Sequence, residues 1–274
     1  MAREVVDEST FLAIERQFHD RYADIVDWDE PIGDSLGYEY CEEAEEKVRQ
    51  LLANVGNLQV LEIGSGHGNS ALILAKCGAI VTSIDISPKL IEGCKHRSAV
   101  HNLSVDFRVM NACKLEFPDE SFDIVTAVRT VHHLPDVDAF YHEAKRVLKP
   151  KGALVLLEPQ KYNPFVELGR RFIKRGPEWR TATEHPFVPR DLALLRREFA
   201  TSEKWEYGFL VSACQVFNLL GWKRAFTLSV AITRPLDRML QSVPVFRPLY
   251  WQVVVHAVKA SGSHDGGSGV PTYN

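Results

Sequence analysis

The stretch Val60-Leu61-Glu62-Ile63-Gly64-Ser65-Gly66-His67-Gly68 decides the fold of this 274-residue chain. A short, mostly apolar run leads into three glycines at alternate positions, and Asn69–Lys76 follows with a helical pattern. Glycine lets the backbone turn sharply and lets a ligand approach without meeting a Cβ atom. The stretch therefore predicts a strand, a ligand-binding turn and a helix, which together open an α/β fold.

The next strand candidate, Ile80–Asp85, ends in an acid about 20 residues after the glycines, where a ribose-hydroxyl acceptor is expected. Two details argue against a dinucleotide as the ligand. The third glycine comes one residue earlier than in G-x-G-x-x-G, and Glu62 would repel a pyrophosphate. The same carboxylate would favour an ammonium group, such as that of a methionine moiety.

The alternation of strand and helix continues downstream to Glu158. Repeated units with short links predict a mostly parallel sheet with helices on both faces. Ser87 and Asp136 are predicted helix N-caps, and Lys149–Gly152 is a predicted turn. The remaining expected strands are Val105–Met110, Phe122–Val128 and Ala153–Glu158, and residues 8–26 and 40–55 carry apolar helical faces.

After Pro159 the regular alternation stops. We expect one domain over residues 1–260, with a core at 55–160 and mainly helical cap insertions at about 160–200 and 211–248, lying over the sheet. Trp205–Leu210 and Tyr250–Val258 are expected to close the sheet as an antiparallel edge pair. Residues 261–274 are rich in Gly and Ser and are predicted to be a disordered tail.

The bulk composition excludes several classes of protein. A net charge of −4 and the lack of a basic domain argue against a nucleic-acid binder. The five cysteines form no C-x-x-C pair, which indicates free thiols in a reducing compartment and neither a disulfide framework nor a zinc site. The first residues lack a long apolar run, so no secretory signal is predicted. We expect a cytoplasmic protein.

Four ordered segments give the chain a family resemblance over about residues 55–160. It resembles the class I S-adenosylmethionine (SAM)-dependent methyltransferases, in particular the broad small-molecule subgroup that includes ubiquinone and menaquinone methyltransferases. The resemblance implies a Rossmann-like three-layer sandwich around a seven-stranded, mostly parallel sheet with an antiparallel edge strand and a helical cap after the fifth strand. The segments are Val60–Gly68, Ile84–Ser87, Asn111–Cys113 with Phe117–Asp123, and Arg146–Gly152.

The resemblance also implies SAM as cofactor, S-adenosylhomocysteine as its product, and a role for each matching residue. The adenine is expected to lie against Ile86, Asn111 and Ala112, and the ribose hydroxyls on Asp85. Tyr22, on the N-terminal helix, is expected to close over the donor. Asn111 stands where many relatives have Asp, and Arg129 is unusual at its position and could face the acceptor instead. The methionine end is assigned to Glu62, Gly64, Ser65, Gly66, Gly68, Val128 and Arg129.

Methyl transfer from a sulfonium is an in-line displacement, so the enzyme mainly aligns the reactants and excludes water. A general base is needed only for an acceptor that holds a proton. His132 and His133, after the fourth strand, are the candidates, and the alternative is that they are hydrogen-bonded loop or core histidines. Asp136 is better interpreted as a helix cap than as a metal ligand, and no metal is predicted.

The sequence describes the acceptor less well than the donor. We expect a small molecule, methylated on an oxygen of a lipophilic, glycosyl or secondary-metabolite substrate. The alternatives are C-methylation in quinone or sterol-type biosynthesis and a non-catalytic SAM-binding module. The basic residues at 170–175 and the apolar stretch 209–232 could contact a membrane peripherally or cover a lipophilic acceptor; a solvated helix face and buried core helices are the plainer interpretations.

Overall fold

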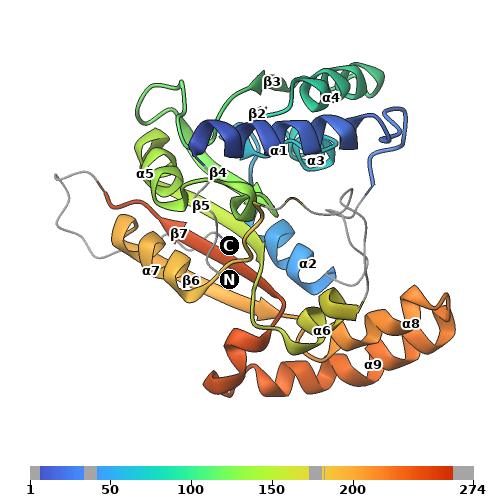
Figure 1. Cartoon of the computed structure of the whole chain (residues 1–274). Coiled ribbons are helices and arrows are strands. Elements are labelled where there is room, and N and C mark those ends of the chain that lie inside the picture. Colours follow the sequence, from blue (N-terminus) through green and yellow to red (C-terminus); the bar gives the residue numbers. More distant parts are fainter. Residues whose placement is uncertain (1–6, 34–41, 173–180, 182, 262–274) are drawn as a thin grey trace.

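A computed structural model describes residues 7–33, 42–172, 181 and 183–261 of the chain. Their centre is a seven-stranded sheet in the order β3-β2-β1-β4-β5-β7-β6 (Figure 1). The strands β1 to β5 run parallel, and β7 is antiparallel to both β5 and β6, as the expected closing pair requires. The strand bounds are Gln59–Ile63 (β1), Ile80–Asp85 (β2), Asp106–Val109 (β3), Phe122–Val128 (β4), Leu148–Pro159 (β5), Thr201–Tyr207 (β6) and Gln252–Val258 (β7).

Both faces of the central strands β1, β4, β5 and β7 are buried, which explains why β4, β7 and the second half of β5 appear in the sequence as nearly uninterrupted apolar runs. Side chains alternate along each strand, so Leu61 and Val60 enter different clusters. The Leu61 cluster includes residues of α5 and α7, and the Val60 cluster includes residues of α2, α3 and α4. This layering is the predicted three-layer α/β sandwich.

The helices begin where the sequence places capping residues. The Ser87 side chain accepts a hydrogen bond from the Leu90 amide, with Pro88 at the first helical position. The Asp136 side chain caps α5 in the same way. The helix bounds are Glu8–Ala23 (α1), Glu42–Leu51 (α2), Asn69–Lys76 (α3), Pro88–Val100 (α4), Val137–Val147 (α5), Pro164–Phe172 (α6), Pro189–Glu198 (α7), Gln215–Leu219 (α8) and Lys223–Leu240 (α9), with short 3-10 helices at Val131–His133 (η2), Val211–Cys214 (η4) and Pro244–Leu249 (η5).

The predicted turn at Lys149–Gly152 is instead part of β5. Leu148 pairs with Phe122 and Ala153 pairs with Ile124, so the four residues between them form an irregular bulge inside the strand. The Lys149 ammonium binds the Asp123 carboxylate, which holds the bulge against β4. The prediction of a turn is therefore wrong, because the pairing with β4 on either side of these residues continues the strand.

The two insertions after β5 take different positions. In the first, α7 packs against α5, while α6 lies beside η4. In the second, α8 and α9 form a hairpin that projects from the β6 side of the molecule, away from the sheet rather than over it (Figure 1). None of the described helices is long and apolar enough to cross a membrane. The predicted disordered tail lies, from residue 262 onward, outside the described residues.

Candidate functional site

The glycine turn after β1 uses backbone conformations that other residues rarely adopt. Gly64, Gly66 and Gly68 have φ angles of 81°, 49° and 82°. A Cβ atom on Gly64 would lie 2.2 Å from the Thr130 hydroxyl oxygen, so this glycine lets β1 and the end of β4 come together. Around Gly66 no heavy atom of the described residues beyond its chain neighbours lies within 4 Å of a Cβ position. A ligand can therefore approach the backbone there.

Glu62, the last polar residue of β1, is buried beneath this turn. Its carboxylate accepts a hydrogen bond of 2.5 Å from the Ser83 hydroxyl, which lies 2.8 Å from the Ser65 hydroxyl. Burial raises the pKa of Glu62 to about 7, although the hydrogen bond from Ser83 opposes that change. A cationic ligand group beside this carboxylate would favour its charged form.

Asp85 ends β2 and is fixed by two backbone donors. One carboxylate oxygen accepts from the Gly66 amide at 3.3 Å, and the other accepts from the Ser87 amide at 2.9 Å. Burial raises the pKa of Asp85, and the charge of His19 and the two backbone bonds oppose this. A carboxylate can accept about four hydrogen bonds. The Asp85 carboxylate can therefore accept two further hydrogen bonds, which suits two adjacent hydroxyl groups such as those of a ribose.

The next predicted residues lie beside Asp85, at the carboxyl ends of β2 and β3. The Met110 amide donates to the Asp85 carbonyl oxygen at 3.0 Å, so the chain after β3 lies against the end of β2. The Asn111 side-chain oxygen accepts from the Cys113 amide at 2.9 Å. Ala112 is buried and Ile86 is half-buried. Open α/β sheets bind ligands at this edge.

Helix α1 covers part of the same edge. The Ser87 hydroxyl donates to the Asp20 carboxylate at 2.5 Å, and the Arg16 guanidinium donates to the Ile86 carbonyl oxygen at 3.2 Å. Tyr22, expected to close over the donor, lies on this helix with 40% of its surface exposed. The most buried side chain of α1 is Glu15, which is not among the residues that the family resemblance indicates.

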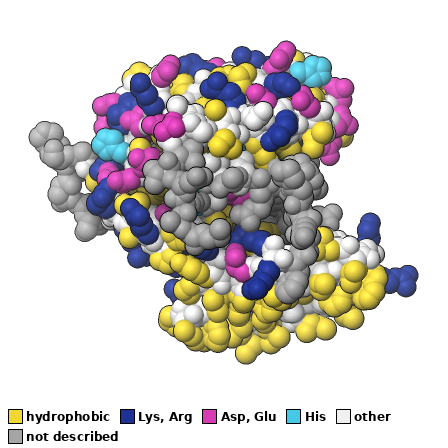
Figure 2. All heavy atoms as spheres, in the orientation of Figure 1, with side chains coloured by type: hydrophobic (Ala, Val, Ile, Leu, Met, Phe, Trp, Pro, Cys, Tyr) yellow, Lys and Arg dark blue, Asp and Glu magenta, His cyan; other side chains and the backbone are white. Residues whose placement is uncertain are grey.

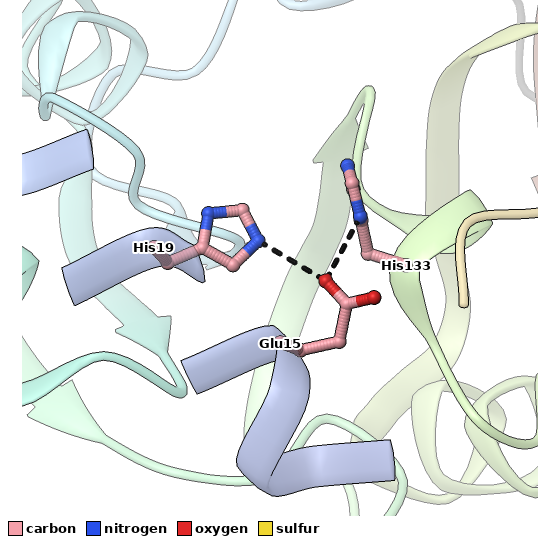
Figure 3. Close-up of side chains that lie close together, drawn as sticks. All are labelled: Glu15, His19 and His133. Atoms are coloured by element: carbon pink, nitrogen blue, oxygen red, sulfur yellow. Dashed lines mark hydrogen bonds and ion pairs between the residues drawn. The ribbon is translucent and has the colours of Figure 1, made fainter. Parts of the chain in front are cut away.

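Glu15 joins two histidines in a cluster that bridges α1 and η2 (Figure 3). One carboxylate oxygen lies 3.1 Å from His133 Nδ1 and 3.6 Å from His19 Nε2. The other oxygen accepts bonds from the Thr181 and Thr183 hydroxyls. A signal for Glu15 was present, because it lies in the apolar stripe of the N-terminal helix between Phe11 and Phe18.

The cluster shifts the pKa values of its members in different directions. Burial opposes charge on Glu15, but the hydrogen bonds from His133 and His19 hold its pKa well below the usual range. Burial also lowers the pKa of His133, with the nearby His132 adding to the effect. For His19 burial is outweighed by the hydrogen bond to Glu15 and by the charge of Asp85, so its pKa is raised.

The same three side chains are the described residues that could hold a metal ion. Their ligand atoms lie within 4.8 Å of one another. Two histidines and one carboxylate form a donor set that zinc and related cations accept. Hydrogen bonds from the histidines and two threonines already satisfy the carboxylate here. The expectation that the site holds no metal remains a prediction.

His132 has a different partner. Its Nδ1 lies 2.7 Å from one carboxylate oxygen of Glu158, and the other oxygen accepts from the Thr130 and Val131 amides at 2.9 and 2.8 Å. Burial raises the pKa of Glu158 to about 7 and lowers that of His132 to about 4. Glu158 thereby fixes the backbone turn after β4 with one carboxylate oxygen and holds the His132 ring with the other.

Val128, the last residue of β4, and Arg129, which follows it, are the remaining residues predicted to bind the cofactor. Arg129 has a φ of 54°, and its amide donates to the Leu157 carbonyl oxygen at 2.6 Å. Its guanidinium binds the Glu45 carboxylate of α2 at 2.8 Å. The side chain thus points to α2, away from the β2 and β3 edge. Of the basic cluster, Arg170 pairs with Glu167, and Lys174 and Arg175 lie outside the described residues.

Residues 61–156 match the family described as "Methyltransferase domain". Demethylmenaquinone methyltransferase from Tropheryma whipplei is 31% identical over 195 residues, which are 68% of this chain and 77% of the relative. The 27-O-demethylrifamycin SV methyltransferase from Amycolatopsis mediterranei is 35% identical over 156 residues, 50% of this chain and 55% of the relative.

A solved structure shares the fold. It is geranyl diphosphate C-methyltransferase from Streptomyces coelicolor A3(2), in complex with Mg²⁺, geranyl diphosphate and S-adenosylhomocysteine. Its TM-score is 0.58 at 14% identity, with 90% of this chain and 98% of that chain covered. At this identity the likeness concerns the fold.

Proposed function

The chain belongs to the class I SAM-dependent methyltransferases, and from this premise we propose that it methylates an oxygen on a lipophilic small molecule. SAM is the methyl donor, and methyl transfer to a small molecule is the activity that the names of the three proteins described above give. The observation that carries the donor part of the proposal is the arrangement at the carboxyl edge of β1 and β2. There two buried carboxylates, Glu62 and Asp85, flank the open backbone of Gly66.

We assign the donor residues as follows. Glu62 attracts the ammonium group of the methionine end, and the Gly64–Gly68 turn lies against that end with Ser65. Asp85 accepts from the two ribose hydroxyls, while Ile86, Asn111 and Ala112 contact the adenine. The backbone of Val128 and Arg129 borders the methionine end, and Tyr22 approaches from α1. These residues fit the group because they combine buried acceptors with a backbone free of side chains.

His133 is our candidate for the general base, with Glu15 as its positioning residue. The Glu15 carboxylate engages Nδ1 of the ring, which leaves Nε2 as the nitrogen that can accept a proton. The His132 ring is more buried and is occupied with Glu158. A hydroxyl acceptor loses its proton on methylation, and the free Nε2 of His133 is placed to take it. C-methylation at a ring C–H also releases a proton, so the presence of a base fits both acceptors, and the choice between them is left to the labelling experiment below.

We expect the rate of transfer to fall on the acid side with an apparent pKa below the ordinary histidine value of 6.5, because burial lowers the pKa of His133. His133 must be neutral to accept a proton, so activity is retained at higher pH and lost as the pH falls through the lowered pKa. His133→Asn should reduce kcat by about 10²–10⁴-fold and abolish the acid limb. The measurement is a pH profile of kcat at saturating SAM.

His142→Asn is the matched control, since His142 is exposed on α5. The hydrogen bonds that Glu15 makes between α1 and η2 do not produce the acid limb. They lower the pKa of Glu15, so the stability that its charged form contributes is fully present above the ordinary value of 4.5 and is lost only as the pH falls further. If His133→Asn kept both kcat and the acid limb, His133 would not be the base.

The proposed function is tested by transfer of a labelled methyl group. The protein is incubated with methyl-labelled SAM and cell extract, and the products are divided between organic solvent and water. We expect the label to enter solvent-extractable material, with the bond formed to oxygen as shown by mass spectrometry of the isolated product. Label confined to the aqueous phase would contradict a lipophilic acceptor, and label on carbon would support the C-methylation alternative.

A further inference from the structure

The hairpin after β6 exposes an apolar face that the donor site does not use. Of the seventeen large hydrophobic side chains that are exposed among the described residues, ten lie between residues 216 and 245. We call them the hairpin face. Figure 2 shows hydrophobic side chains covering the lower side of the molecule, where Figure 1 places α8 and α9. The ten are Val216, Leu219, Leu220, Trp222, Leu228, Ile232, Leu236, Met239, Val243 and Val245.

Helix α9 presents its apolar stripe outward. Leu228, Ile232 and Met239 are 64%, 59% and 70% exposed and follow helical spacing. The opposite side of the helix carries Asp237, which is buried and accepts hydrogen bonds from the Leu210 and Val211 amides. A surface helix of a water-soluble domain normally has the reverse arrangement. An exposed apolar stripe of this kind marks an interaction surface.

The charge of the segment indicates what covers the face. Residues 209–251 contain five basic side chains and a single acid, the buried Asp237. Arg234 and Arg238 pair with Glu42 and Glu43 of α2. Lys223, Arg224 and Arg247 are the basic side chains of this segment with no acidic partner among the described residues. Lys223 and Arg224 are exposed at the end of the hairpin, next to Trp222. Apolar side chains bordered by tryptophan and basic residues are typical of helices that lie in a membrane interface.

We propose that the hairpin face lies on an anionic lipid membrane, with its apolar side chains at the boundary between headgroups and acyl chains and Lys223 and Arg224 at the phosphates. The base of the hairpin is tied to the chain that follows β5. The buried Asn163 side-chain amide donates to the carbonyl oxygens of Phe209 and Leu249. The inference deepens the proposed function, since a docked enzyme would take a lipophilic acceptor directly from the bilayer.

The test is co-sedimentation of the full chain with vesicles, without SAM or acceptor. We expect binding to phosphatidylcholine vesicles containing phosphatidylglycerol, and weaker binding to phosphatidylcholine alone or at high salt. The variant L228S/I232S/M239S should bind at least roughly 30-fold more weakly, because three apolar side chains leave the interface. K223E/R224E should lose the preference for the anionic lipid.

I80S/V100S/V109S is the matched control, because it removes three exposed hydrophobic side chains at the opposite edge of the sheet. It should bind vesicles like the wild type. Equal binding by L228S/I232S/M239S and wild type would overturn the proposal. The proposal would also be overturned if the wild type bound no vesicles and formed a dimer that dissociates in L228S/I232S/M239S. In that case a second copy of the chain would cover the face. If the wild type transferred methyl groups in detergent but did not bind vesicles, the docking surface would be refuted and the proposed function would stand.

Discussion

Asp85→Ala is expected to weaken the binding of S-adenosylhomocysteine by about 10²–10³-fold. The carboxylate is proposed to accept from both ribose hydroxyls, and a hydrogen bond to a charged group contributes about 1.5–3 kcal/mol. The two backbone donors that fix the carboxylate, Gly66 and Ser87, leave it little freedom to turn away. The measurement is a calorimetric titration of each variant.

The stability of Asp85→Ala should change much less than its affinity. Burial raises the pKa of Asp85, so above that pKa its charge costs folding free energy in the absence of ligand. We expect the thermal midpoint of Asp85→Ala to stay within a few degrees of the wild type, since the relieved charge offsets the two lost backbone bonds. Asp106→Ala, which removes an exposed acid from β3, is the control. Unchanged affinity in Asp85→Ala would show that the ribose assignment is wrong.

Gly64→Ala is expected to destabilise the protein by about 2–5 kcal/mol and to abolish measurable methyl transfer. The φ of 81° costs a non-glycine residue roughly 1–2 kcal/mol. The new methyl group would also lie 2.2 Å from the Thr130 hydroxyl oxygen and 2.6 Å from its methyl carbon. Relief of such overlap costs about 1–3 kcal/mol and moves the turn or the end of β4. Thermal denaturation and the rate of transfer measure the two effects.

Two further variants separate the causes. Gly208 has a φ of 76° with no heavy atom within 4 Å of a Cβ position among the described residues, so Gly208→Ala isolates the backbone cost. Thr130→Ala removes the two atoms nearest to the new methyl group, so the double variant Gly64→Ala/Thr130→Ala should regain part of the lost stability. If Gly64→Ala proved to be as stable as Gly208→Ala, the close packing of the turn on β4 would be contradicted.

The donor half of the molecule could be predicted from the sequence because its determinants are local. Ile80–Asp85 and Phe122–Val128 have the bounds that their apolar runs predict. Parallel strands buried on both faces leave such uninterrupted runs. The glycine turn follows for the same reason, since the positive φ angles and the open space at Gly66 are properties of a few consecutive residues.

The remaining features depend on partners that are distant in the sequence. Glu15 meets His133 and Thr181 across separations of 118 and 166 residues, and no local pattern specifies those contacts. Arg129 likewise pairs with Glu45 of α2, 84 residues earlier in the chain.

The hairpin shows the same limit for hydrophobic patterns. The sequence identifies an apolar stretch after residue 209, but hydrophobicity alone does not say which side of a helix faces the protein. In α9 that side is set by the buried Asp237, whose hydrogen bonds to the start of η4 turn the apolar stripe outward.

The claim that this site binds SAM is tested most directly by calorimetric titration of the wild-type protein with S-adenosylhomocysteine and, separately, with NAD. Glu62 and the early third glycine are expected to accept the homocysteine end and to repel a pyrophosphate. We expect one molecule of S-adenosylhomocysteine to bind per chain, with a dissociation constant in the micromolar range, and we expect no heat of binding from NAD. Binding of NAD without binding of S-adenosylhomocysteine would contradict it.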